Sequence, residues 1–299
     1  MKNVHIPVLL EEVLSFIKDD YSVVFDGTFG GGGHSLAILK KFNNIKVIAT
    51  DIDEDALLRG KEIVEDNNRL VLLKENFKNI DIVLKKLGIE KVDFILADLG
   101  VSSNLIEDNE RGFSFMIDGP LDMRMDKQLE IDAKYIINNY SVKDLADIFE
   151  KYGEEKKALK IAKHIIEERK KSPIVTTKRL SEVVCKVIRK QKGIHPATLV
   201  FQALRIYVNK ELDSLEEFLE KAINLLNIGG RVAVISFHSL EDRIVKNFFK
   251  EKEKERLLKI LTKKPIAPKF EEVKVNRRAR SAKMRVGEKI FIGAMNESV

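Results

Sequence analysis

The ten residues from Asp26 to Ser35, DGTFGGGGHS, constrain the fold of this chain more than any other segment. They follow an apolar run that ends at Phe25 and precede a helical pattern that begins at Leu36. Glycine is needed where φ is positive or where a ligand must approach the main chain. A glycine-rich turn between a strand and a helix is typical of nucleotide-cofactor sites in doubly wound sheets, although a plain turn has the same composition.

Strand and helix patterns alternate through the first hundred residues. Apolar strand patterns end at or just before Asp26, Asp51, Lys74 and Asp98, and segments with helical spacing of apolar residues separate them. Strands that alternate with helices predict βαβ units, and hence a parallel sheet with helices on both faces.

The alternation returns after residue 212. In order, the patterns predict a long amphipathic helix, a strand over 231–237, a helix over 241–261 and short strands over 273–275 and 289–292. Gly229 and Gly230 are expected to cap the first of these helices. A terminal antiparallel pair on a parallel sheet departs from the dinucleotide-binding fold and favours a class I methyltransferase sheet.

Between these parts, in the segment 105–210, the alternation stops and the pattern becomes helical from residue 131 to about 209. A polar stretch runs to about Met125, apolar residues then recur at helical spacing, and Ser141 and Asp144 have the spacing of a capping box. We therefore predict an α/β domain made of residues 1–104 and 211–299, with an all-helical domain, 105–210, inserted into it.

Composition narrows the class of protein. The chain has 299 residues, of which 44% are hydrophobic and 33% charged, as in globular proteins with a sizeable core. No signal region or membrane-spanning run is evident, so we expect a cytoplasmic protein without membrane association. Cys185 is the single cysteine, and no His, Asp or Glu spacing resembles a metal site, so no metal is expected. The oligomeric state is left open, and a homodimer is compatible with the sequence.

The distribution of positive charge suggests a polyanionic partner more than the net charge of +6 does. Five basic residues crowd into nine positions near the C-terminus: Arg277, Arg278, Arg280, Lys283 and Arg285. Such a cluster can neutralise phosphates and position a nucleic acid. The alternative is a solvated charged loop.

Acidic residues at the strand ends discriminate between cofactors. Asp51 stands where a carboxylate can accept hydrogen bonds from the ribose hydroxyls of an adenosine; alternatively it is a turn residue before a helix that Asp53 or Asp55 could cap. Asp26 would suit an ammonium group and repel a pyrophosphate. These features favour S-adenosylmethionine (SAM) over NAD.

Asp98 ends the fourth predicted strand, at the edge where parallel strands form a ligand crevice. Methyl transfer from a sulfonium depends on positioning the acceptor lone pair. A carboxylate that accepts the N–H hydrogens of an exocyclic amine would localise that pair and stabilise positive charge. Asp98 is thus a candidate for this catalytic role or for binding the cofactor, and a plain strand-end aspartate would do neither. His34 and His238 are each open to a site role or a structural one.

The chain resembles the bacterial family of ribosomal RNA small-subunit methyltransferases H, also called MraW. The resemblance spans nearly the whole chain. It rests on the segments His5–Val13, Asp26–His34, Ala97–Ser103, Glu110–Phe115, Gly119–Asp126, Phe201–Val208, Ser236–Arg243 and Arg278–Lys283.

The resemblance implies methyl transfer from SAM to N4 of a cytidine in the decoding region of 16S rRNA, either free or in the small ribosomal subunit. It implies a Rossmann-like, class I SAM-dependent methyltransferase sheet with a helical insert. The cofactor contacts that it implies are Gly32, Gly33, His34, Asp51, Phe77 and Asp98. Phe77 would pack on adenine, or else belongs to the core.

Three positions depart from the family pattern. Leu105 stands where a glutamine usually contacts the cofactor, Leu199 where an arginine is common, and Arg277 where a proline is usual.

The target base would have to leave its stack, with the basic cluster, Arg111, Arg124 and the insert holding the RNA backbone.

Two other functions compete with this one. A DNA amino-methyltransferase usually has a proline-proline-aromatic motif after the fourth strand, and none follows Asp98. The other is a non-catalytic SAM- or nucleotide-binding protein associated with RNA, against which the intact Asp51 and Asp98 argue.

Overall fold

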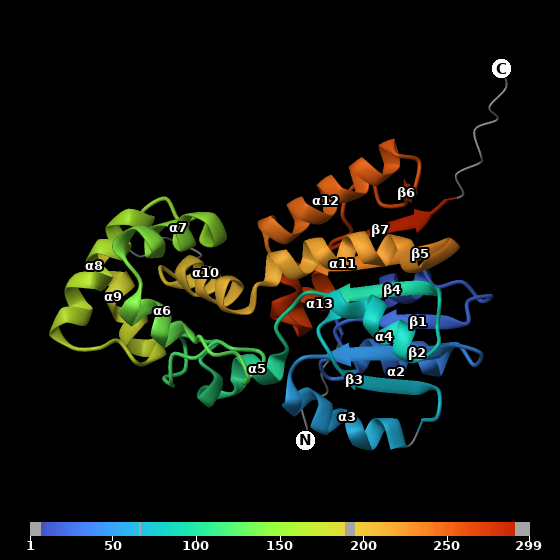
Figure 1. Ribbon diagram of the computed structural model, residues 1–299, viewed down its shortest axis with the longest axis horizontal. Helices are drawn as coiled ribbons and strands as arrows, with labels where there is room; N and C mark the ends of the chain where they lie inside the picture. Colours follow the sequence, from blue (N-terminus) through green and yellow to red (C-terminus); the bar gives the residue numbers. More distant parts are fainter. Residues whose placement is uncertain (1–6, 66, 189–194, 291–299) are drawn as a thin grey trace. The chain divides into compact units, whose positions relative to one another are not determined.

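The computed structural model describes residues 7–65, 67–188 and 195–290. The chain divides into two compact units, one made of Met1–Gly100 with Leu212–Val299 and the other of Val101–Glu211 (Figure 1). In the described ranges, no helix combines the length and the apolar character that crossing a membrane requires.

The first unit is built on a seven-stranded sheet in the order β3-β2-β1-β4-β5-β7-β6. The first five strands are parallel, and β7 runs antiparallel to both β5 and β6. The strands are β1 Val23–Asp26, β2 Lys46–Asp51, β3 Leu70–Lys74, β4 Val92–Asp98, β5 Leu226–Ser236, β6 Leu258–Ile260 and β7 Lys283–Lys289. The predicted fold class, a class I methyltransferase sheet, is confirmed.

Apolar side chains cover both faces of this sheet because successive residues of a strand point to opposite sides. Val24 and Phe94 face a core that includes α1 Leu10–Ser15 and α2 Gly33–Lys41. Phe25 and Ile95 face the opposite core, which α4, α11 and α12 cover. The remaining helices of this part are α3 Glu54–Glu65, η1 Phe77–Asn79, α4 Ile80–Lys86, α11 Glu211–Leu225, α12 Ser239–Lys254, α13 Phe270–Val275 and η3 Arg277–Ser281.

The second unit is helical in its regular elements and has its own apolar core, which includes Ile136, Phe149 and Leu204. Its helices are α5 Ser103–Glu107, η2 Asn109–Arg111, α6 Ala133–Asn139, α7 Val142–Gly153, α8 Ala158–Lys171, α9 Thr177–Val187 and α10 Thr198–Asn209. The predicted capping box is confirmed, because the Ser141 side chain accepts from the Asp144 N–H and the Asp144 carboxylate accepts from the Ser141 N–H.

Two sequence predictions near the C-terminus are wrong, and a third is not tested. Residues 273–275, predicted as a strand, lie in α13. The helix predicted over 241–261 ends at Lys254, and its last part is the edge strand β6. Apolar residues at 257, 258, 260 and 261 fit either a helical or an alternating period, so tertiary pairing with β7 decides. Of the strand predicted over 289–292, residues 291 and 292 lie outside the described residues.

The sequence predicted that Gly229 and Gly230 cap a helix, and this prediction is wrong. The helix α11 ends at Leu225, and both glycines lie in β5, where the pairing with β4 shifts register. Gly229 has a φ of 78°, which disfavours other residues. Its carbonyl accepts hydrogen bonds from the Lys18 ammonium (3.0 Å) and the Tyr21 hydroxyl (2.8 Å), so the irregularity is fixed by side chains from before β1.

Arg285, one of the five clustered basic residues, is a structural residue. It lies on β7, is buried, and donates from Nε to Asp242 Oδ1 on α12 at 2.7 Å. Burial alone would raise the pKa of Asp242, but its hydrogen bonds with Arg285 lower it below the ordinary value. The guanidinium of Arg285 therefore joins β7 to α12.

We predict that Arg285→Met lowers the free energy of unfolding by about 2 to 3 kcal/mol at pH 7, because it leaves the largely buried Asp242 without its principal partner. A lowered carboxyl pKa contributes stability above the unfolded pKa and loses it as the pH falls through the folded pKa. The difference should therefore shrink below about pH 4 in denaturant titrations. The exposed Arg280→Met is the control, with a change of about 0.5 kcal/mol or less. Equal effects from the two variants would contradict the assignment.

Candidate functional site

Three aspartates stand at the carboxyl ends of three adjacent parallel strands. Asp26 ends β1, Asp51 ends β2 and Asp98 ends β4. β1 lies between the other two, with Asp26 in register with Ala49 and Leu96. Parallel pairing therefore brings all three carboxylates to one edge of the sheet, as the strand pattern predicted.

Asp26 holds the glycine-rich turn by hydrogen bonds to residues on both sides of it. It is buried, and its two oxygens accept hydrogen bonds from the Ser35 hydroxyl (2.6 Å) and the Thr28 N–H (3.2 Å). Burial raises its pKa. Both oxygens of Asp26 accept hydrogen bonds from within the turn. This geometry does not favour the direct contact with an ammonium group that the sequence suggested.

Asp51 ties the end of β2 to the same turn. Its Oδ2 accepts from the Gly30 N–H at 2.7 Å and its Oδ1 from the Asp53 N–H at 2.9 Å. Burial raises its pKa to about 6, against the effect of these hydrogen bonds. A Cβ added at Gly30 would meet only the Thr28 carbonyl oxygen, at 4.0 Å. The main chain beside the Asp51 carboxylate is therefore open.

Gly32 and Gly33, in contrast, are glycines because protein atoms fill the space. A Cβ at Gly32 would lie 2.7 Å from the Phe29 ring, and one at Gly33 would lie 2.4 Å from the Pro7 ring. Gly32 also has a φ of 76°. Packing explains both residues here, and the contact with a cofactor that the resemblance implies at these positions remains a proposal.

His34 and Asp98 face each other across the first turn of α2. The buried His34 donates from Nε2 to the Val8 carbonyl at 3.0 Å. This fixes the proton on Nε2, so that Nδ1, which lies 3.9 Å from Asp98 Oδ2, bears a lone pair in the neutral ring. The two groups attract each other only when one additional proton is present on either of them.

Of the three aspartates, Asp98 is the one with a buried carboxylate oxygen that accepts no hydrogen bond in the described structure. Its side chain is 17% exposed, and its Oδ1 is buried without a hydrogen-bond partner in the described structure. Burial raises its pKa to about 6, and the nearby His34 acts in the opposite direction. The Phe237 ring packs over the backbone just beyond it, within 2.7 Å of where a Cβ on Gly100 would be. A buried carboxylate oxygen without a partner suits a ligand that donates a hydrogen bond or carries positive charge.

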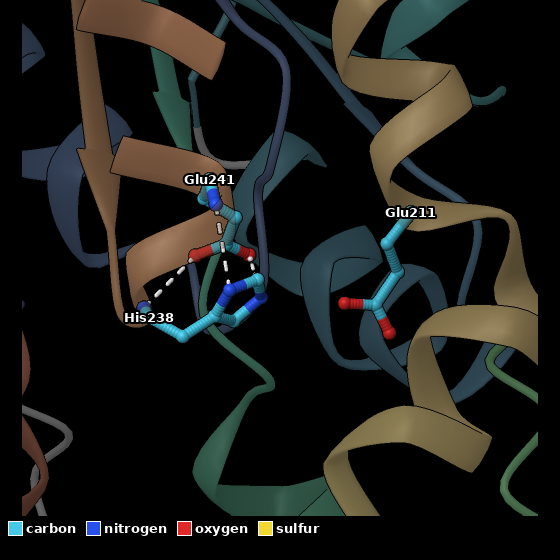
Figure 2. Close-up of side chains that lie close together, drawn as sticks. All are labelled: Glu211, His238 and Glu241. Carbon is cyan, nitrogen blue, oxygen red and sulfur yellow. Dashed lines mark hydrogen bonds and ion pairs between the residues drawn. The ribbon is translucent and has the colours of Figure 1, made fainter. Parts of the chain in front are cut away.

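Glu241 is a fourth carboxylate near this edge, and its role could not be inferred from the sequence. Figure 2 shows it with His238, whose backbone N–H donates to Glu241 Oε2 at 3.3 Å and whose Nε2 lies 3.0 Å from Glu241 Oε1. His238 caps α12, with Glu241 completing the capping box. This favours the structural role for His238. Glu241 itself is buried and its charge raises the pKa of Asp98.

Phe77 belongs in part to the core. Its ring meets that of Phe218 edge-to-face, with centroids 5.0 Å apart, and remains partly exposed. Its Cβ lies 2.9 Å from where a Cβ on Gly27 would be, so it packs against the strand end that begins the glycine-rich turn. Both interpretations of Phe77 are compatible with this position.

Two residues that the sequence proposed as RNA contacts have partners within the protein. Arg111 is buried and donates to the carbonyls of Arg124 and Met125. Arg124 makes a bidentate pair with Asp122, at 2.8 Å for both hydrogen bonds. These guanidinium groups organise the polar segment of the second unit. Leu105, where the family usually has a glutamine, is buried.

Comparison with known proteins identifies relatives over nearly the whole chain. The sequence profile of the MraW methylase family matches residues 2–290. Curated proteins called ribosomal RNA small subunit methyltransferase H match at 50% identity in Endomicrobium trichonymphae and at 51% in Sulfurihydrogenibium sp. (strain YO3AOP1). A third, from Clostridium botulinum (strain 657 / Type Ba4), is 47% identical. Each match covers 96% of this chain and 99% of the relative.

The raised pKa of Asp98 predicts a measurable cost of ionising it in the ligand-free protein. A carboxyl pKa raised on folding contributes stability below the unfolded pKa, and that contribution is lost as the pH rises through about 6. Asp98→Asn cannot ionise. Its stability relative to the parent protein should therefore rise by about 2 kcal/mol between pH 4 and pH 7 in denaturant titrations.

The exposed Asp20→Asn serves as the control, with a difference that does not vary in this way. A stability difference for Asp98→Asn that stays flat from pH 4 to pH 7 would show that Asp98 ionises at no cost.

Proposed function

The chain belongs to the MraW methylase family, a family of rRNA small-subunit methyltransferases, and from this premise we propose that it methylates N4 of a cytidine in the decoding region of 16S rRNA. SAM is the methyl donor. The observation that carries the N4 assignment is Asp98, a partly exposed strand-end carboxylate whose Oδ1 is buried and unpartnered. An exocyclic amine, which receives the methyl group, has two N–H hydrogens, and it can donate one of them in a hydrogen bond to this oxygen.

The residues of the first unit fit SAM as cofactor. SAM supplies a methyl group that its positively charged sulfur activates. Asp51 lies beside the open main chain at Gly30, and we assign it to the ribose hydroxyls. His34, Phe77 and the turn at Gly32 and Gly33 border the same strand ends. A cluster of buried carboxylates favours a cationic cofactor over a pyrophosphate.

Asp98 has two tasks in this proposal. By accepting an N–H of the exocyclic amine, it keeps the nitrogen lone pair out of the ring and oriented for attack. When the new N–C bond forms, the nitrogen must release one proton. Asp98 has an unpartnered carboxylate oxygen and is ionised when the cationic cofactor is bound, so this carboxylate can accept the proton and then return it to solvent.

We predict that Asp98→Ala abolishes methyl transfer and that Asp98→Asn lowers kcat by about a hundredfold or more, because an amide cannot take up the proton. Small ribosomal subunits that lack the modification are incubated with labelled SAM. The digested rRNA is then analysed for N4-methylcytidine by mass spectrometry. Label found on another atom or another base would contradict the acceptor assignment. Binding of SAM by the parent protein without any transfer would favour a non-catalytic RNA-associated protein.

We predict that Asp51→Ala weakens SAM binding by about tenfold or more, because two ribose hydroxyls lose a charged acceptor. Calorimetric titration measures the dissociation constant at pH 7.5. Asp20→Ala, an exposed aspartate before β1, is the matched control and should bind as the parent protein does. Circular dichroism must first show that Asp51→Ala is folded, because Asp51 also holds Gly30 and Asp53. Unchanged affinity in a folded Asp51→Ala would remove Asp51 from the site.

A further inference from the structure

The short helix α13 exposes large apolar side chains at both of its ends. Phe270 is 77% exposed and Val275 is 71% exposed. They are two of the three most exposed large hydrophobic side chains among the described residues. An exposed aromatic ring is a group on which the base of a single-stranded nucleic acid can stack.

The segment that contains Phe270 is strongly basic. Between residues 269 and 280 there are five basic residues and two acidic ones. Of the two acidic residues, Glu272 is turned inward, where its Oε1 accepts from the Leu9 N–H at 2.8 Å, and Glu271 is exposed. Lys274 lies one helical turn after Phe270, on the same face of α13. Arg277 and Arg280 follow in η3, and both are exposed.

The same segment is attached to the glycine-rich turn by a short series of contacts. Glu272 holds the backbone of Leu9. The preceding residue, Val8, accepts from His34 Nε2, and Pro7 packs against Gly33. Behind η3, Ala279 is buried in the core on this face of the sheet. The exposed ring is therefore held by a fixed scaffold that also positions His34.

We propose that α13 and η3 form a docking site for single-stranded RNA, in which Phe270 stacks on one base and Arg277 and Arg280 contact phosphates. An aromatic ring beside a basic track is the combination that binds single strands without sequence preference. Charge favours RNA over a protein partner, because the patch would repel a basic ribosomal protein. The inference rests on the proposed function, in that it identifies where the strand next to the target base is held.

The test measures binding of a short fluorescein-labelled single-stranded RNA of mixed sequence to the full chain, by fluorescence anisotropy. Phe270→Ala should raise the Kd by about tenfold, and Phe270→Trp should restore it to within about twofold of the parent value. Ile82→Ala, which truncates an exposed apolar residue on α4, should leave the Kd unchanged. Replacing Arg277 and Arg280 by Gln should lower the slope of log Kd against log salt by about 0.7 for each lost phosphate contact.

The dissociation constant for SAM should be the same in all of these variants, which checks that the fold is intact. Equal RNA affinity for Phe270→Ala and the parent protein overturns the stacking role. A loss that appears only with whole small subunits and not with free RNA also overturns it, and indicates an apolar contact with a ribosomal protein. Because the assay involves no methyl transfer, its result is independent of whether the N4 assignment succeeds or fails.

Discussion

The hydrogen-bonded pairing of β1 with both β2 and β4 is the interaction on which the site depends. In this parallel arrangement the three strands end at one edge, so Asp26, Asp51 and Asp98 are placed by backbone register rather than by side-chain contacts. The glycine-rich turn leaves the middle strand at the same edge and is fastened by two of these carboxylates. A shift of one residue in either pairing would turn these side chains to the opposite faces.

Several carboxylates in one partly buried region repel each other, and the structure limits this cost in different ways. Asp26 and Asp51 each accept two hydrogen bonds from the turn or its neighbours. Asp98 has an oxygen without a partner, and burial raises its pKa, with the charges of Asp26 and Glu241 acting in the same direction. The remaining imbalance is an excess of negative charge at the strand ends. A cationic ligand such as SAM would offset it, because opposite charge favours the ionised carboxylates.

The sequence predicted the parts of the fold that depend on local periodicity, and it missed those that long-range contacts decide. The ends of β2 and β4 at Asp51 and Asp98 could be predicted because each follows a run of buried residues. Residues 273–275 could not, since three residues do not distinguish a helical from an alternating pattern. In the site, the strand-end carboxylates could be predicted from the order of strands. The internal role of Arg111 could not, because a buried guanidinium and a phosphate-binding one have the same sequence signature.

We infer that the strand-end carboxylates are protonated in part when the site is free and become ionised when SAM binds. Calorimetric titration of SAM at pH 6, in buffers of different ionisation enthalpy, measures the number of protons exchanged on binding. Because Asp51 and Asp98 have pKa values of about 6 in the free protein, binding should release protons at this pH. The release should disappear in the double variant Asp51→Asn, Asp98→Asn. Binding without proton release, or with proton uptake, would contradict this account of the site.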